Sequence, residues 1–477
     1  MRKPTIFYGA LLLSGANLAL QGVSMLFRIW LSRAVGAEGL GLMQLILSVG
    51  ALAMTVGISG ARVAALYLCA EELGLRRSRG VARVLLACVR YGLVASMAAG
   101  LALILGADLL VRRWIGDAAA AGSLRLLGLF LPTDCLGAIL SGWFTASGRV
   151  GRLVSVQALE RGASIALTVL LLRAGADACR AVILGSGLAS LLGLTTMSLI
   201  CFRALPKPDP SIPAAKRLLR LCLPLALGDY LRAGLSTASH LLIPRGLARS
   251  GDSAEAAVAA YGVIHGMVFP VLFFPAALLY ALADLLIPEL SRLRVQGETV
   301  GIRALTDRCF RMGVVFACAC AGTLHLLSAP LGRLLFRCEQ AGYYLALFAP
   351  LIVVLYLDTV TDSLLKGLGQ QLFCVRCSIF TSVLEVVGLL VLLPRLGMMG
   401  YFLTFAVTRL INYLLGAGRL LRVTAASLPT RFCLKLAVCL GACAVLFRPL
   451  PWLFLPGFVL CLAATGTLAL TTAENAI

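Results

Sequence analysis

Apolar stretches recur from one end of this chain to the other, and short polar gaps separate them. Each stretch is roughly 20 residues long, which is enough for an α-helix to cross the hydrocarbon core of a bilayer. The pattern therefore predicts an all-α polytopic membrane protein with about 14 transmembrane helices. The predicted helices lie near residues 6–30, 40–66, 81–111, 123–145, 150–172, 179–202, 218–243, 256–290, 309–336, 343–365, 371–393, 398–421, 431–447 and 452–472.

The composition supports this prediction and excludes several classes of protein. Hydrophobic residues make up 60% of the 477 residues and charged residues only 13%, with a mean hydropathy of +0.96. A water-soluble domain of this composition would expose large apolar patches. No gap is much longer than about 15 residues, which leaves no room for a P-loop or another folded domain outside the membrane. We therefore expect neither an enzyme nor an ATP-driven pump, and no cofactor or metal.

The positive charge is distributed unevenly between the gaps. Lys and Arg total 42 against 21 Asp and Glu, a formal net charge of +21. Most cations collect at the N-terminus and in every second gap, a pattern that predicts a plasma-membrane protein with both termini in the cytoplasm. The same charge favours contact with anionic lipid headgroups rather than with nucleic acid. The first of these basic gaps include Arg76, Arg77, Arg79, Arg83, Arg149 and Arg152.

A proline-rich polar segment after the sixth predicted helix suggests a division into two lobes. We predict an N-terminal six-helix lobe over 1–202, a cytoplasmic linker over 203–217 and a second six-helix lobe over 218–422. Two additional helices follow in 423–477. The short sequences at 129–132 and 347–350 resemble each other, as expected for two lobes that are repeats of one unit.

Polar side chains form a stripe on each of the first two predicted helices. They recur at intervals of three and four residues on the first, so they share one face of that helix. They can hydrogen-bond neighbouring helices, or they can line a water-filled cavity on a substrate path. We favour the cavity, because both stripes end in an arginine, whose guanidinium matches phosphate oxygens. The candidate substrate-binding residues are Asn17, Gln21, Ser24, Arg28, Gln44 and Arg62.

Charged residues also occur within later predicted helices. Two alternatives stay open for them: ion pairs that fix helix packing, or a site that couples transport to a proton or sodium gradient. His265 and His325 are expected to be packing residues. The candidate residues for ion coupling or charge balance are Glu160, Asp229, Arg232, Asp358, Asp362, Lys366, Glu385 and Arg409.

Residues 27–41, which read FRIWLSRAVGAEGLG, resemble the loop signature after the first helix of oligosaccharide flippases related to stage V sporulation protein B. These flippases belong to the multidrug, oligosaccharidyl-lipid and polysaccharide exporter superfamily. Residues 286–291 and Pro270 resemble the eighth helix of that group, and Gln157 with Glu160 resembles a polar pair of its fifth helix. The seventh helix departs from the pattern, because Ser239 and His240 stand where relatives often have an acid.

The resemblance implies two six-helix bundles plus two terminal helices. It also implies alternating-access transport of an undecaprenyl-diphosphate-linked oligosaccharide or peptidoglycan precursor to the outer leaflet, by a monomer, with Arg28 and Arg62 at the diphosphate. The departure in the seventh helix weakens the case for inherited ion coupling. The alternative is a proton- or sodium-coupled multidrug antiporter, which needs an acidic, aromatic-lined pocket. A non-transporting membrane scaffold that recruits cell-wall enzymes is a third class.

Overall fold

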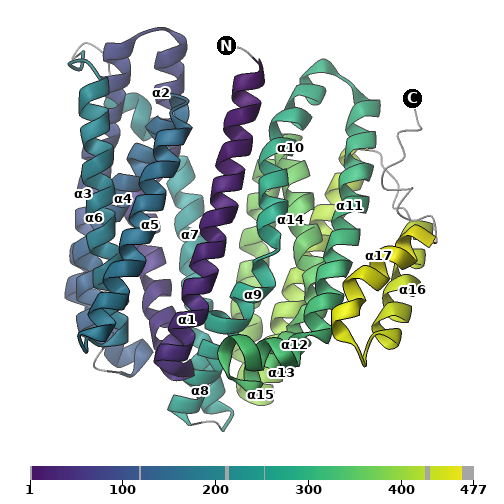
Figure 1. Ribbon diagram of the computed structural model, residues 1–477. Coiled ribbons are helices and arrows are strands. Elements are labelled where there is room, and N and C mark those ends of the chain that lie inside the picture. The colour runs from purple at the N-terminus through teal and green to yellow at the C-terminus, as the bar shows by residue number, and fades with distance from the viewer. Residues whose placement is uncertain (1–2, 118–119, 210–213, 252, 425–429, 465–477) are drawn as a thin grey trace. The chain divides into compact units, whose positions relative to one another are not determined.

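The computed structural model describes residues 3–117, 120–209, 214–251, 253–424 and 430–464 (Figure 1). Within these ranges the chain is a series of helices joined by short turns, and it contains no strand. Nine of the described helices are long and apolar enough to cross a bilayer, and two shorter apolar helices follow near the C-terminus. The prediction of an all-α polytopic membrane protein is confirmed.

The first seven helices correspond closely to the predicted spans. The first long helix, α1, contains the first predicted span and most of the second. The rest of the second span lies in α2. The others match one for one. They are α1 (Lys3–Ile58), α2 (Ala61–Gly74), α3 (Ser78–Leu110), α4 (Ala120–Ala146), α5 (Val150–Arg173), α6 (Ala178–Ala204) and α7 (Ala214–Arg249).

The remaining helices are more interrupted than the apolar pattern predicts. They are α8 (Ala254–Gly262), η2 (Val263–Val268), α9 (Phe269–Phe273), α10 (Ala276–Gln296), α11 (Thr299–Leu326), α12 (Ser328–Leu331), η3 (Gly332–Phe336), α13 (Glu339–Phe348), η4 (Ala349–Leu351), α14 (Ile352–Gly367), α15 (Gln371–Thr424), α16 (Thr430–Leu446), η5 (Pro451–Leu453) and α17 (Phe454–Ala464). The last predicted span extends to residue 472, and its final part lies outside the described residues.

Glycine and proline account for most differences between predicted and observed boundaries. Gly36 in α1 has φ 78° and ψ 178°, and Gly397 in α15 has φ 54° and ψ −135°. A side chain would disfavour both conformations, so each glycine divides one long helix into two spans. The predicted eighth helix over 256–290 is divided in the structure, because a turn at Phe274 and Pro275 separates α9 from α10, whereas the π-helical segment η2 continues the helix from α8 to α9. The predicted tenth helix over 343–365 lies within one helical span, Glu339–Gly367. Pro350, which lacks the N–H of an α-helical hydrogen bond, stands in its short 3-10 segment η4.

The chain forms two compact units, which we describe separately. The first unit comprises Met1–Phe27 with Val35–Arg245, and the second comprises Arg28–Ala34 with Gly246–Ile477. Most of α7 therefore packs with the first unit, although it follows the linker. Ion pairs and hydrogen bonds hold it there: Arg217 contacts Glu72 at 2.6 Å, and the Thr237 hydroxyl donates to the Ser48 carbonyl at 3.1 Å. The division into repeats at 203–217 stays a prediction.

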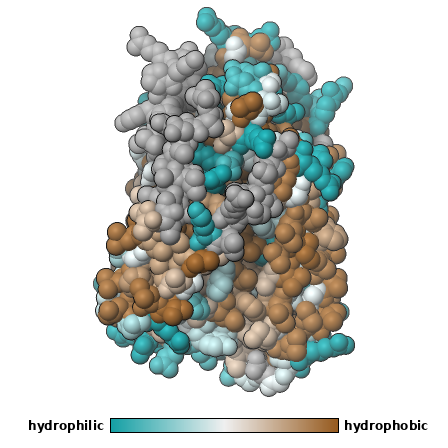
Figure 2. All heavy atoms as spheres, turned by 90° about the vertical axis from the view of Figure 1, so that its right-hand side faces the viewer, coloured by the Kyte–Doolittle hydropathy of each residue, from teal (hydrophilic) through white to brown (hydrophobic). Residues whose placement is uncertain are grey.

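Each unit has its own hydrophobic core. In the first unit, Trp143 and Phe144 of α4 pack with Leu85 and Cys88 of α3 and with Leu218 of α7. In the second unit, the two C-terminal helices α16 and α17 pack against α11 through a cluster that includes Leu436, Phe454, Phe458 and Val314. Figure 2 shows the face that carries α11, α16 and α17, where hydrophobic side chains gather below the middle and hydrophilic ones gather towards the two ends. This distribution is typical of a surface that meets lipid tails between two polar interfaces.

Candidate functional site

The first unit contains an open polar cavity of about 390 Å³. Four helices contribute to its wall, and all of the lining residues except Leu20 are polar. The interior of a transmembrane bundle is normally apolar, and polar groups there commonly mark a transport path. The lining residues are Leu20, Gln21 and Ser24 of α1, Asp134 of α4, Gln157, Glu160, Arg161 and Ser164 of α5, and Ser186 of α6.

Helical spacing explains how these residues reach one wall. Gln157, Glu160, Arg161 and Ser164 stand at positions i, i+3, i+4 and i+7 of α5, so their side chains project from one face. Gln21 and Ser24 of α1 are likewise three residues apart. Because four helices pack side by side, these two faces meet Asp134 and Ser186 around the same hollow.

The cavity contains more acidic than basic groups. Asp134 and Glu160 are both half-buried, and neither belongs to an ion pair in the part of the chain that the structure describes. Arg161 is the one basic residue on the wall. A Cβ atom on Gly193 of α6 would lie 2.7 Å from Glu160 Oε2, so this glycine leaves room for the carboxylate. The arrangement presents hydrogen-bond acceptors and one strong donor to a ligand.

The structure brings only part of the predicted cavity set together. Gln21 and Ser24 lie on the wall, and Glu160 joins them. Gln44 is half-buried with its Nε2 unpaired, Arg62 is exposed at the start of α2, and neither lines this cavity. The side chain of Asn17 lies outside the described residues. Arg28 is exposed and belongs to the second unit.

Sequence reasoning missed four of the polar lining residues, namely Asp134, Arg161, Ser164 and Ser186. Two signals were available. Asp134 is a carboxylate within a predicted membrane span, two residues after Pro132. The polar residues of the fifth span also follow the helical period, as those of the first span do.

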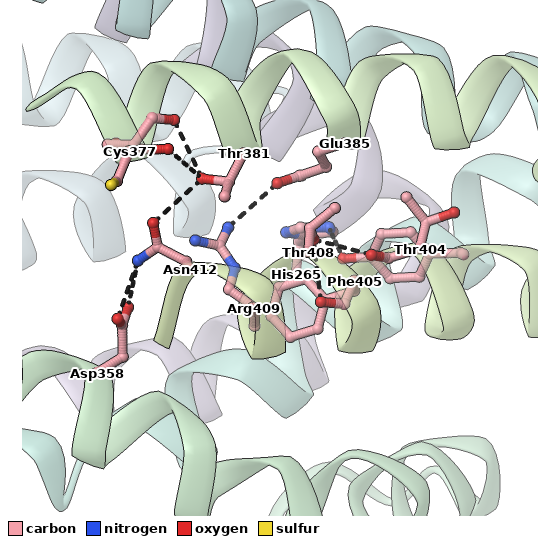
Figure 3. Close-up of polar contacts among 12 residues, drawn as sticks. His265, Asp358, Cys377, Thr381, Glu385, Thr404, Phe405, Thr408, Arg409 and Asn412 are labelled. Atoms are coloured by element: carbon pink, nitrogen blue, oxygen red, sulfur yellow. Dashed lines mark hydrogen bonds and ion pairs between the residues drawn. The ribbon is translucent and has the colours of Figure 1, made fainter. Parts of the chain in front are cut away.

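In the second unit, several charged residues inside the helices form ion pairs, and Figure 3 shows one of them, between Arg409 and Glu385. Arg409 of α15 donates to Glu385 of the same helix at 3.3 Å, across the kink at Gly397. Lys366 and Asp362 of α14 are 2.5 Å apart. Asp358 differs, because both its oxygens accept from the Asn412 amide at 2.9 Å, and it forms no ion pair with any described residue.

Asp229 and Arg232 on α7 also form an ion pair, 3.1 Å long and exposed. The candidate residues for ion coupling are thus mostly neutralised by a neighbour, and Asp358 and Glu160 are the exceptions among them. What these groups do in transport stays a prediction.

His265 and His325, which the sequence predicts to be packing residues, both have polar contacts, although His325 is exposed. His265 Nε2 lies 3.1 Å from the Tyr401 hydroxyl, and its ring packs 4.5 Å from that of Tyr261. His325 Nδ1 lies 3.0 Å from the Ala346 carbonyl. Both side chains therefore have partners within the second unit.

The comparisons with known proteins agree with this architecture. Residues 13–157, which hold Gln21, Ser24, Asp134 and Gln157, match the MatE family. The chain is 22% identical over 456 residues to stage V sporulation protein B of Bacillus subtilis strain 168, covering 92% of this chain and 88% of that protein. Both likenesses agree with the resemblance to the multidrug, oligosaccharidyl-lipid and polysaccharide exporter superfamily. Together with the apolar helices they support a multi-pass membrane transporter.

Solved structures share the fold of this transporter. One is described as the inward-facing conformation of a multidrug resistance MATE family transporter, with a TM-score of 0.66, 15% identity, and coverage of 86% of this chain and 96% of that one. The outward-facing conformation of a multidrug resistance MATE family transporter gives a TM-score of 0.62 at 14% identity, covering 87% and 95%. At these identities the likeness concerns the fold alone.

Proposed function

We propose that this transporter moves a lipid-linked saccharide, such as an undecaprenyl-diphosphate-linked oligosaccharide or peptidoglycan precursor, from the inner to the outer leaflet by alternating access. It acts as a monomer in the plasma membrane, with both termini in the cytoplasm. The observation that carries the proposal is the polar cavity of the first unit. Its volume of about 390 Å³ falls within the range of small-molecule sites.

The chemistry of the wall suits a saccharide. Gln21 and Gln157 each offer amide donors and acceptors, Asp134 and Glu160 accept from hydroxyls, and Arg161 donates. A sugar ring displays many hydroxyls that both donate and accept, so it can satisfy all these groups. A site for aromatic cationic drugs would instead be lined by aromatic rings, and no aromatic residue is among the described residues that line this cavity.

The diphosphate of such a lipid needs cationic partners outside this acidic cavity. Arg28 and Arg62 are both exposed and serve this role in our proposal, because guanidinium and phosphate form paired, charge-assisted hydrogen bonds. The name of the relative, stage V sporulation protein B, supports a role in sporulation or cell-wall assembly.

The second candidate is a proton- or sodium-coupled antiporter for cationic drugs. Asp358 favours it, because this half-buried carboxylate has an amide partner but no ion pair among the described residues. The solved relatives with multidrug resistance in their descriptions support the same candidate. A carboxylate in this state can exchange a proton or a cation during transport.

Reconstitution tests the two candidates directly. The transporter is placed in vesicles with a fluorescent undecaprenyl-diphosphate disaccharide, and the fraction that reaches the outer leaflet is measured by its accessibility to an external glycosidase. We expect faster exposure than in protein-free vesicles. Arg28→Ala and Arg62→Ala should each slow it by roughly tenfold or more, since hydrogen bonds to charged groups contribute about 1.5–3 kcal/mol. Arg113→Ala, in the π-helical segment η1 (Val111–Ile115) that follows α3, is the matched control and should transport normally.

The drug candidate predicts a different result in the same vesicles. Uptake of a cationic dye driven by a pH gradient, abolished by Asp358→Asn, would favour the antiporter. Lipid exposure no faster than in protein-free vesicles would contradict the flippase. Normal lipid transport by both arginine variants would contradict diphosphate binding by these arginines, but it would not contradict the proposed flippase function.

A further inference from the structure

A second hollow of about 380 Å³ lies in the first unit, where α3 and α7 both begin. It is distinct from the polar cavity and shares none of its lining residues. Arg83, Arg90 and Tyr91 of α3 contribute its polar groups, and Leu86, Val94 and Leu219 contribute apolar surface. We call this hollow the α3–α7 groove.

The floor of the groove is firmly held. Leu218 of α7 packs in a buried cluster with Val84 and Cys88 of α3. Arg217 fastens the start of α7 to the end of α2, through Glu71 at 2.7 Å and Glu72 at 2.6 Å. The Glu72 side chain is only 1% exposed, so its ion pair with Arg217 has a buried carboxylate. The two walls of the groove are therefore fixed relative to each other without any ligand.

The groove carries positive charge that no described side chain neutralises. Arg83 and Arg90 form no ion pair within the described chain, and Arg83 Nε is buried without a hydrogen-bond partner. A buried donor without a partner is unfavourable and rare in native proteins. The two residues are seven positions apart, about 10 Å along the helix, so one anionic group between them can reach both flexible side chains.

Exposed apolar stripes continue from the groove along both of its helices. On α3 the stripe consists of Val94, Met97, Leu101 and Leu105, and on α7 it consists of Leu219, Leu223, Leu227 and Leu231. Each of these side chains is at least 50% exposed, and the intervals of three and four residues place them on one face of each helix. Each stripe is about 17 Å long, close to half of the roughly 30 Å hydrocarbon core.

We propose that the α3–α7 groove binds one anionic glycerophospholipid. Its phosphate lies between Arg83 and Arg90, and its acyl chains follow the two stripes through one leaflet. The charge favours an anionic over a zwitterionic lipid, because only the former carries a net negative charge to neutralise the guanidinium groups. The stripes favour a lipid over free phosphate, which would leave the apolar surface uncovered. The site is separate from the proposed saccharide cavity. Lipid binding there does not depend on which substrate the transporter carries.

Lipid selectivity provides the test, without any transport substrate. The transporter is reconstituted with spin-labelled phosphatidylglycerol or phosphatidylcholine, and the fraction of motionally restricted label is measured by electron paramagnetic resonance. We expect roughly a tenfold preference for phosphatidylglycerol at one site. The double variant Arg83→Gln with Arg90→Gln should lose it. Arg112→Gln with Arg113→Gln, an equal loss of charge in η1 just beyond the end of α3, should keep it.

Two further measurements separate the electrostatic and lipid components. Arg83→Lys with Arg90→Lys keeps both charges and should retain a preference over phosphatidylcholine. Excess inorganic phosphate should displace the labelled lipid no better than chloride of equal ionic strength. The proposal is overturned if the wild type shows no preference, if the control loses it equally, if the lysine variant is as poor as the glutamine variant, or if inorganic phosphate competes.

Discussion

The polar cavity of the first unit and the charged network of the second unit use similar residues in opposite ways. In the first unit, Asp134 and Glu160 face a hollow and have no ion-pair partner within the described residues. In the second, Glu385 is bound to Arg409 and Asp362 to Lys366. The difference shows that charge inside a helical bundle can be neutralised by the protein or left available to a ligand. Only a charged group that no protein partner neutralises can bind the transported substrate directly.

The local geometry explains why the two regions differ. Asp362 and Lys366 stand four residues apart on one helix, the spacing that favours an ion pair. Asp134 and Glu160 lie on different helices and line the same cavity as amide and hydroxyl side chains. Gly193 leaves space for the Glu160 carboxylate where a larger residue would displace it. Pairing in the second unit should therefore contribute to stability, and the cavity of the first unit should contribute to transport.

The largest effect on stability is expected from Arg409→Ala. The Glu385 side chain is only 17% exposed, and loss of its partner leaves a buried carboxylate unpaired, which costs about 3–5 kcal/mol. Thermal unfolding in detergent should show a clear decrease in Tm. Arg292→Ala is the control, because its pair with Glu289 is exposed at 59% and 45% and should contribute at most about 1 kcal/mol. Equal losses in both variants would contradict the distinction between the two regions.

The cavity acids should show the reverse result, a loss of transport without a loss of stability. Asp134→Asn and Glu160→Gln keep the shape of each side chain but remove its charge, and neither breaks an ion pair between described residues. Loss of a hydrogen bond to a charged acceptor corresponds to about 1.5–3 kcal/mol, so we expect roughly tenfold slower transport of the fluorescent lipid. The Tm should stay close to that of the wild type. A fall in Tm as large as that of Arg409→Ala would indicate a structural role instead.

A smaller effect is expected from Gly193→Ala. The added methyl would lie 2.7 Å from Glu160 Oε2, so the carboxylate must shift and transport should fall a few-fold. Alanine is the better helix former by about 0.5–1 kcal/mol, so stability should not suffer. Gly137→Ala is the matched control, because a methyl there meets no atom within 4 Å. Transport that is reduced equally in both variants would exclude displacement of Glu160 as the cause.

The sequence alone was sufficient for much of the architecture. Apolar length identified the membrane spans, because lipid requires each crossing segment to satisfy its own backbone hydrogen bonds. The three- and four-residue period of the first span placed Gln21 and Ser24 on a common face. The motif at 27–41 indicated the superfamily. The turn at Pro275 and the 3-10 segment at Pro350 were missed, because hydropathy does not report where the hydrogen bonding of a helix changes.

What the tertiary structure decided was which polar residues meet. Periodicity shows which residues share a face of one helix, but not which helix packs against that face. The sequence therefore could not assign Asp134 of α4 and Ser186 of α6 to the cavity that Gln21 of α1 lines. It also decided which charges are neutralised, since Arg409 and Glu385 are 24 positions apart in sequence but 3.3 Å apart in space. Such contacts depend on how helices pack, and packing depends on the shape of every surface involved rather than on the order of residues along one segment.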